Sequence, residues 1–509
     1  MTAEAQVPTT PSPSGIIPWR LVISFFLFLT FTFAIFSTGR VHTIDEVSAV
    51  YQTESLALRG STAVPQAVMA KWFYGELDRF GQPQTPYPPG QPVASIPWFV
   101  VGHFAAKHLP GVPVDSRDVV GDLFFTASSA AYSALAATIA LVIFLRMKIS
   151  VGGSLAAAGM LALASPLTAY SAWFFSEPLA TVFLVGAAAA LFTGDADIPV
   201  SKGRAALAGI LLGAAIWVRP THVLAAAVFL IALYVRDRKS SFTAAAMLSV
   251  IVGFAGEAFL WRNNYLFGSF FNFGYPPAAE GGKALNTFNT PFFTGLFGYL
   301  FSPGKSIFIF APVVLLAIFG WRSLWRKNRG LATVALLTPI VYILFFATYT
   351  QWEGGYCYGP RYLLPALTLL GLALGPVLAD GGRWVRVSAI VLFVAGFAVQ
   401  AIGITTSFLE AAVGKYYDAT FNYNMAFAPV WRQTRFLWYY AKSPVPAPMG
   451  RGFDRWWLLL GKAGVSHGTL WTIGILEFAC AAISGFVLWQ SWKNRERAVE
   501  IPAQSVTSD

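Results

Sequence analysis

Charged residues are scarce in this chain of 509 residues. Aspartate, glutamate, lysine and arginine make up 12% of the sequence, whereas hydrophobic residues make up 56%. Soluble globular proteins carry about a quarter charged residues. A deficit of this size, spread over the whole length, means that lipid surrounds most of the chain. The sequence therefore predicts an all-α polytopic membrane protein.

Cysteine and histidine are also rare. Cys357 lies in a predicted outward-facing loop and Cys480 within the last apolar run, so we expect no disulfide between them. The spacing of the five histidines does not match a zinc site. These histidines are His42, His103, His108, His222 and His467. The composition thus argues against a disulfide framework and against a zinc-binding module.

The basic residues are not gathered on one stripe, although the net charge is +11. A nucleic-acid-binding surface would show such a stripe. Many of them instead form short clusters between apolar runs, as the cytoplasmic loops of membrane proteins do. The clusters are Arg146/Lys148, Lys202/Arg204, Arg236/Arg238/Lys239, Arg322/Arg326/Lys327/Arg329, Arg383/Arg386 and Lys493/Arg495/Arg497.

Apolar runs long enough to cross a bilayer begin near residues 20, 119, 151, 176, 204, 221, 243, 304, 331, 362, 388 and 467. Placing the basic clusters inside gives about 12 transmembrane helices with both termini cytoplasmic. We therefore expect a disordered cytoplasmic tail at residues 1–19, a transmembrane domain at 20–491 and a second cytoplasmic tail at 492–509. The first apolar run lacks a small-residue cleavage site, so it is predicted to stay as an uncleaved span.

This orientation places four long or aromatic segments outside. They are residues 38–118, 261–303, 349–361 and 406–466. Within the first of them, residues 92–106 are apolar yet flanked by two outer stretches. We interpret them as a re-entrant or interfacial helix, and a full span remains the alternative.

The acidic pair Asp45-Glu46 follows the first span. Residues 43–58, closed by Arg59-Gly60, are predicted to form a helix near the membrane surface. Thr43 and Glu46 have the spacing of a capping box, which gives Glu46 a purely structural alternative. A carboxylate held at a helix start is also fixed in orientation, as a general base must be. Asp45 and Glu46 are therefore the candidate catalytic residues.

Glu177 and Arg219 are further candidates. Glu177 opens the fourth span from outside, either as a partner of the helix dipole or as a ligand of a metal or an acceptor. Arg219 lies at the turn of a short pair of spans, whose arms of roughly 16 residues reach about 24 Å against about 30 Å of hydrocarbon. A buried arginine at that depth costs ~2.5–3.5 kcal/mol unless it has a partner. Arg219 is thus either paired within the protein or bound to an anion.

Arg361 and Lys305 occupy outer helix starts, where a cation is electrostatically unfavourable. A bound phosphate would remove the penalty, because it fits both an arginine fork and the free helix amides. Headgroup anchoring is the alternative for both residues, and it is stronger for Lys305. The loop before Arg361 contains three glycines, which suits a backbone that approaches a ligand. Its candidate residues near the site are Glu353, Tyr356 and Tyr358.

Several short motifs follow one another along the chain. They are Asp45-Glu46, Tyr87-Pro88-Pro89-Gly90, Phe175-Ser176-Glu177, Arg219-Pro220-Thr221, Asn264-Tyr265-Leu266-Phe267-Gly268-Ser269, Phe301-Ser302-Pro303-Gly304 and Gly359-Pro360-Arg361-Tyr362. In this order they resemble the GT-C superfamily of polyprenyl-phosphate-dependent glycosyltransferases. Within this superfamily, the pattern is most similar in character to bacterial relatives of protein O-mannosyltransferases and of the lipid A aminoarabinose transferase.

The resemblance implies a GT-C-like bundle with a helical first extracytoplasmic loop, in a bacterial plasma membrane, with the active site facing outside. It implies an enzyme that moves a sugar, with inversion, from a polyprenyl-phosphate donor to a hydroxyl of a glycan, lipid or protein acceptor. Asp45 then matches the family's catalytic base or acceptor-orienting group, and the mannosyltransferases carry an adjacent Asp-Glu pair there. Arg219, Arg361 and Lys305 would bind the donor phosphate. No cofactor is certain, and a divalent cation held by Asp45, Glu46 and Glu177 stays open.

Two other functions fit parts of the pattern. A transporter or flippase of a lipid-linked or anionic substrate also has about 12 spans and buried arginines, but its charges commonly lie near the midplane. A glycan polymerase or ligase acting on a diphosphate-linked donor is the other alternative. No nucleic-acid partner is expected.

Overall fold

The computed structural model describes residues 17–194, 198–236, 242–276, 288–411, 419–442 and 453–500. Within these residues nearly all regular structure is helical, so the all-α prediction is confirmed. The exception is a short antiparallel pair, β1 (Glu76–Leu77) and β2 (Pro83–Gln84). Most of the first predicted tail, half of the second, and parts of two predicted outer loops and two predicted inner loops lie outside the described residues.

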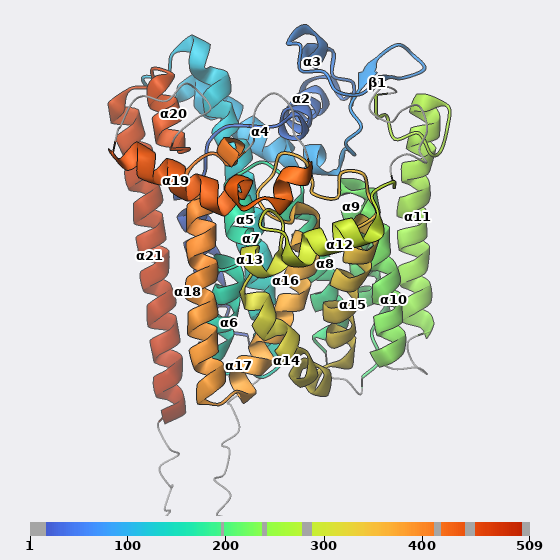
Figure 1. The fold of residues 1–509 in the computed structure, drawn as a ribbon, viewed down its shortest axis with the longest axis vertical. Coiled ribbons are helices and arrows are strands. Elements are labelled where there is room, and N and C mark those ends of the chain that lie inside the picture. The colour runs from blue at the N-terminus through green and yellow to red at the C-terminus, as the bar shows by residue number, and fades with distance from the viewer. Residues whose placement is uncertain are drawn as a thin grey trace, which may run out of the picture.

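The bundle is built from long helices that run roughly parallel in Figure 1. They are α1 (Trp19–Ile35), α5 (Arg117–Arg146), α6 (Val151–Leu163), α8 (Glu177–Phe192), α9 (Lys202–Val218), α10 (Val223–Arg236), α11 (Phe242–Phe267), α14 (Val313–Lys327), α15 (Arg329–Phe346), α18 (Arg383–Thr405) and α21 (His467–Glu500). Shorter helices continue or cap them: α7 (Pro166–Ser171), α13 (Ile307–Phe310), α16 (Leu364–Leu370) and α17 (Leu374–Asp380).

Each of the twelve predicted apolar runs begins within five residues of a helix start. Among the described residues, six helical segments are both long and apolar enough to cross a membrane. They are Val114–Arg146, Phe242–Phe267, Arg329–Phe346, Arg361–Asp380, Arg383–Thr405 and His467–Glu496, and shorter apolar helices accompany them. The chain is a multi-pass membrane protein. α21 stays helical to Glu500, past the predicted start of the second tail.

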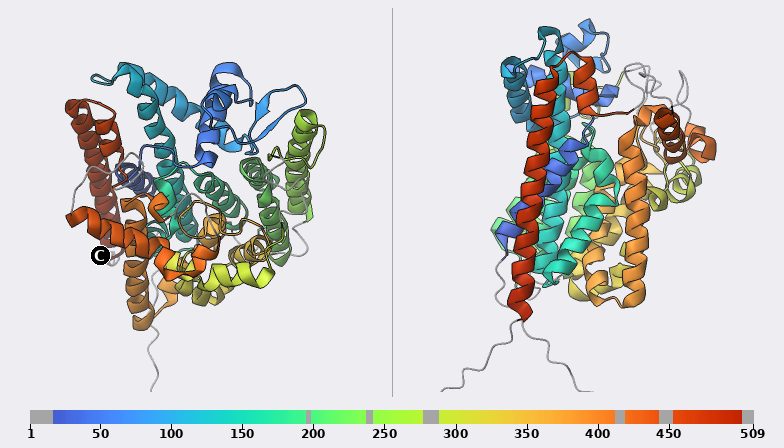
Figure 2. Two further views of the ribbon diagram at one scale, coloured as in Figure 1. Left: turned by 45° about the horizontal axis from the view of Figure 1, so that its top comes forward. Right: turned by 90° about the vertical axis from the view of Figure 1, so that its left-hand side faces the viewer.

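α5 is the centre of the packing, because small side chains line its buried face. Ala130, Ser133, Ala134, Ala137 and Ala140 are all fully buried and recur three or four residues apart. Small residues let helix backbones approach closely, which is how helices associate where lipid removes the usual hydrophobic drive. α1, α4, α6 and α8 pack on α5 as a result. α21 packs along α1 at the edge of the bundle (Figure 2).

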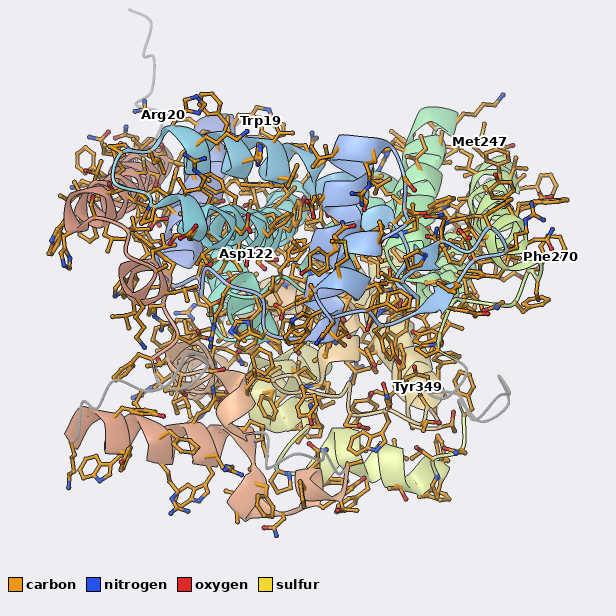
Figure 3. The ribbon with its side chains drawn as sticks, turned by 90° about the horizontal axis from the view of Figure 1, so that it is seen from above. Trp19, Arg20, Asp122, Met247, Phe270 and Tyr349 are labelled. Carbon is orange, nitrogen blue, oxygen red and sulfur yellow. The ribbon has the colours of Figure 1, made fainter. Side chains whose placement is uncertain are left out.

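The loop predicted to be the first outer one is helical, as expected. α2 (Ile44–Arg59) begins after Thr43 and ends at Gly60, which has a left-handed φ of 64°. Residues 92–106 fall within α4 (Gly90–His108). α2 and α4 lie at the end of the bundle that is drawn uppermost in Figure 1, which is called the upper end below. Seen from above in Figure 3, both helices lie across this end rather than along the axis of the bundle. The short α3 (Pro65–Met69) follows α2.

The opposite, lower end carries the junctions at which the predicted basic clusters fall. The α14–α15 and α17–α18 junctions and the C-terminal part of α21 all lie there in Figure 1. α19 (Pro429–Lys442) and α20 (Trp456–Lys462) lie toward the upper end in Figure 1, and α12 (Phe292–Phe301) lies below them. Short 3₁₀ turns, among them η2 (Pro220–His222), η4 (Arg361–Leu363) and η6 (Phe408–Ala411), connect the helices near this end.

Candidate active site

A cavity of about 290 Å³ lies toward the upper end of the bundle. Its wall comes from the first turn of α2, the loop leading into α4, the residues before α8, the α9–α10 turn, the end of α15 and η4. Segments from residue 45 to residue 362 therefore meet there. Asp45, Arg219 and Arg361 all line it, so three of the candidate residues share one space.

Asp45 is held between a phenol and a guanidinium group. Its Oδ1 accepts a hydrogen bond of 2.5 Å from the hydroxyl of Tyr87, and its Oδ2 lies 2.6 Å from Nη1 of Arg361. The side chain is 25% exposed. Burial alone would raise the pKa of the Asp45 carboxyl, but the Arg361 charge and the hydrogen bond from Tyr87 outweigh it and hold the pKa below its usual value. Asp45 is therefore ionised at neutral pH.

Glu177 is shared by two arginines. Its Oε1 lies 2.7 Å from Nε of Arg361 and 2.8 Å from Nη1 of Arg219. Its Oε2 is buried, and no described residue donates a hydrogen bond to it. A proline follows Glu177 at the start of α8, where a carboxylate also favours the helix dipole. The sequence predicts that Arg219 either pairs within the protein or binds an anion. It does pair with Glu177, and its guanidinium group still faces the cavity.

Aromatic rings form much of the remaining wall. The guanidinium of Arg361 lies 4.2 Å above the ring of Phe175, and that of Arg219 lies 4.7 Å above Tyr362. Tyr275 and Tyr349 also face the cavity, and Tyr349 is labelled in Figure 3. Cations are stabilised over ring faces, so the rings hold the guanidinium groups in place. Sequence reasoning missed this wall, because 16% of the chain is aromatic and nothing distinguishes these rings from the others.

Glu46 does not line the cavity. Its Oε2 accepts hydrogen bonds from the backbone N–H groups of His42, at 2.7 Å, and Thr43, at 2.9 Å. Its Oε1 accepts a bond of 2.9 Å from the N–H of Phe174. The predicted capping box is present, and Glu46 is fully buried. The structure therefore separates the two carboxylates of the acidic pair.

Lys305 also lies away from the cavity wall. It is buried, and its Nζ donates a hydrogen bond of 3.1 Å to the carbonyl of Cys357 and lies 3.2 Å from the Cys357 sulfur. Its ammonium group thus braces the loop that leads to Arg361.

The predicted loop residues lie behind the site rather than in it. Glu353 is buried, and the hydroxyl of the buried Tyr358 donates a hydrogen bond of 2.6 Å to the carbonyl of Val399. Tyr356 is exposed. The ends of this loop, at Tyr349 and Arg361, do line the cavity.

The charges of the site fit an anion better than a metal ion. The described residues contain no group of three or more histidine, cysteine, aspartate or glutamate side chains that could hold a metal. Asp45 and Glu177 each lie within 2.8 Å of a guanidinium nitrogen. A divalent cation beside these carboxylates would face two arginines, whereas a phosphate would meet two fork-shaped donors.

No protein-family model and no curated protein matches the chain. In fold it is similar to two crystal structures of ArnT from Cupriavidus metallidurans. The structure bound to undecaprenyl phosphate is 15% identical, with a TM-score of 0.46, over 94% of this chain and 78% of that one. The apo structure is 13% identical, with a TM-score of 0.47, over 92% and 75%.

Proposed function

We propose that the protein is a membrane glycosyltransferase. It would transfer a sugar from a polyprenyl-phosphate donor to an acceptor hydroxyl at the extracytoplasmic face, with inversion. The observation that carries the proposal is the ion pair between Asp45 and Arg361. The two side chains lie 2.6 Å apart at one cavity although the residues are far apart in sequence. The order of the sequence motifs that resemble GT-C enzymes supports the same activity.

The acid–base part of the reaction belongs to Asp45. A hydroxyl is a poor nucleophile, so a carboxylate that accepts its proton as it attacks the anomeric carbon lowers the barrier. Asp45 is a weak base while it is paired with Arg361. A donor phosphate that engages Arg361 would remove this pairing and raise the pKa of Asp45 toward the range of a useful base.

The electrostatic part belongs to Arg219 and Arg361. Charge develops on the phosphate oxygens as the sugar leaves, and donors that already point there stabilise the transition state without reorganising. Glu177 keeps both guanidinium groups aligned through one carboxylate oxygen. A single displacement with Asp45 as base inverts the configuration at the sugar carbon. The position of the basic clusters at the lower end supports an upper end that faces outward.

Transfer of label tests the proposal. Purified protein in lipid nanodiscs is incubated with undecaprenyl-phosphate hexoses carrying a radioactive sugar, together with an envelope extract as acceptor. We expect covalent transfer by the wild type and a fall of about 10²-fold or more for Asp45→Asn, because the base is lost. Asp380→Asn is the matched control, since Asp380 pairs with Lys327 at the lower end.

Two results would contradict the proposal. Near-normal turnover of Asp45→Asn would remove Asp45 from the base role. Movement of the labelled lipid between leaflets without covalent transfer would identify a transporter or flippase instead.

A further inference from the structure

A second ionic cluster lies beside the cavity and joins distant segments of the chain. Oδ1 of Asp454 lies 2.9 Å from Nε of Arg40, and Oδ2 of Asp454 lies 2.6 Å from Nε2 of His42. The side chain of His42 is fully buried and that of Asp454 is 5% exposed. His42 belongs to the loop between α1 and α2, whereas Asp454 precedes α20, 412 residues later. This cluster is called the clamp below.

Backbone hydrogen bonds fix the Asp454 side of the clamp to the bundle. The N–H of Asp454 donates a bond of 3.3 Å to the carbonyl of Thr405, at the end of α18. The N–H of Trp456 donates a bond of 3.2 Å to the carbonyl of Ser37, just after α1. Asp454 is therefore held by two spans of the bundle, and it can act as a fixed point for the loop that carries His42.

The clamp continues to the first turn of α2 through Glu46. Oε2 of Glu46 accepts a hydrogen bond from the N–H of His42 and lies 3.7 Å from Nδ1 of its ring. Oε1 of Glu46 accepts from the N–H of Phe174, and Phe174 lines the cavity. Asp45 precedes Glu46 in the same turn. Fixing Glu46 thus fixes the direction in which Asp45 leaves the helix.

The charge of His42 is part of the clamp. Burial disfavours the charged ring, but the Asp454 charge, the hydrogen bond to Asp454 and the nearby Glu46 carboxylate outweigh it and raise the pKa of His42 from 6.5 to about 9. Nε of Arg40 faces Asp454 and also lies 3.2 Å from Nε2 of His42, and the ring of Phe408 from η6 packs on the imidazole at 5.2 Å. At neutral pH the imidazolium therefore lies between two carboxylates.

We propose that Asp454 is a positioning residue for Asp45. Asp454 holds the His42 ring, His42 and Glu46 hold the first turn of α2, and this turn presents the Asp45 carboxylate to the cavity. The inference rests on the proposed function only in taking Asp45 as the base. Neither Arg219 nor Arg361 belongs to the clamp, and Glu177 holds both guanidinium groups without it. Donor binding should therefore depend on the clamp much less than the position of Asp45 does.

Kinetics of Asp454→Asn test the catalytic side. We expect kcat to fall by about tenfold, because a misplaced group costs catalysis steeply, while the donor KM stays within about twofold. The alkaline limb of the wild-type pH profile should lie near the His42 pKa of about 9 and move toward 6.5 in the variant. Asp380→Asn should change neither value. An unchanged kcat, an effect on KM alone, or a loss that is equal at every pH would overturn the inference.

Hydrogen exchange tests the clamp without any activity. A histidine whose pKa is raised on folding contributes stability that is complete below its unfolded pKa, near 6.5, and is lost as the pH rises through about 9. After correction for intrinsic rates, protection of the amides at residues 43–48 should fall over this range in the wild type. It should be low throughout in Asp454→Asn and restored in Asp454→Glu.

The two kinds of failure are distinguishable. If no donor gives sugar transfer, the proposed function fails, but hydrogen exchange still decides whether the clamp orders α2. If Asp454→Asn does not fold, His42→Gln breaks the same contact and is measured in its place. Protection at residues 43–48 that responds neither to pH nor to either variant would overturn the inference.

Discussion

Asp45 and Glu46 are adjacent in sequence, but their side chains have contrasting environments in the structure. Asp45 is one-quarter exposed, faces a cavity and is paired with groups that a ligand could replace. Glu46 is fully buried and accepts hydrogen bonds from three backbone N–H groups. Successive residues on a helix point about 100° apart. One turn therefore directs one carboxylate to the cavity and the other into the protein.

The comparison extends to the clusters around the two carboxylates. In the cavity, Arg361 and Arg219 pair with Asp45 and Glu177 beside an open volume, so these charges can exchange partners with a bound anion. In the clamp, His42, Asp454 and Glu46 are packed on every side and have no such freedom. The buried charges of the clamp fix the geometry of the chain, whereas the charges at the cavity are available to bind and react.

Removing Arg361 should have the largest effect, because it joins both carboxylates of the cavity. For Arg361→Gln we expect kcat/KM to fall by about 10²–10³-fold, as when one donor of a transition-state site is lost. Thermal stabilisation by undecaprenyl phosphate, measured without any sugar, should fall with it. Arg361→Lys should recover only part of either, since a lysine cannot make the two-pronged contact.

A control variant and a test of folding accompany this prediction. Arg386→Gln removes an exposed arginine at the lower end and should leave both values unchanged. A buried pair that loses one partner is strongly destabilising, so the fold of each variant is checked by size-exclusion chromatography and melting. If Arg361→Gln is folded and retains donor stabilisation, the cavity is not the donor-phosphate site.

Much of the fold could be predicted because lipid imposes simple rules. A run of apolar residues in lipid must form a helix, and the first residue of each run predicted where its helix begins. Thr43 and Glu46 predicted the start of α2, and Gly60 predicted its end. The depth of Arg219 also predicted that it needs a partner or an anion. Each of these inferences uses only residues that are near one another in sequence.

The site could be predicted only in part because it depends on contacts between distant segments. Arg361 and Lys305 look alike in sequence, each a cation at an outer helix start, yet one faces the cavity and the other a loop carbonyl. The same limit applies to Asp454, which has no local motif and meets His42 across 412 residues. Tyr87 stood in a recognised motif, but its bond to Asp45 could not be inferred from that motif.

Glu46→Gln tests the structural half of the pair. We expect the free energy of unfolding to fall by about 1 kcal/mol, because charge-assisted hydrogen bonds to the backbone become neutral ones. Turnover should fall by only about threefold, since Asp45 remains. Asp45→Asn should show the larger loss of turnover, and it should also lower stability at neutral pH, because the ionised carboxylate pairs with Arg361. A loss of turnover in Glu46→Gln as large as in Asp45→Asn, at equal stability, would assign Glu46 a direct part in the reaction.

Lys305→Met should have the smallest effect on the donor. The ammonium of Lys305 bonds to the Cys357 carbonyl behind the cavity, so the donor KM and stabilisation by undecaprenyl phosphate should each change by less than about twofold. Melting should still shift downward, because a buried carbonyl loses its donor. The measurement compares Lys305→Met with Arg219→Gln, which removes a cation that does line the cavity and should weaken donor binding. If both variants weaken the donor equally, Lys305 reaches the phosphate after all, and the loop from Glu353 to Tyr358 must rearrange when the donor binds.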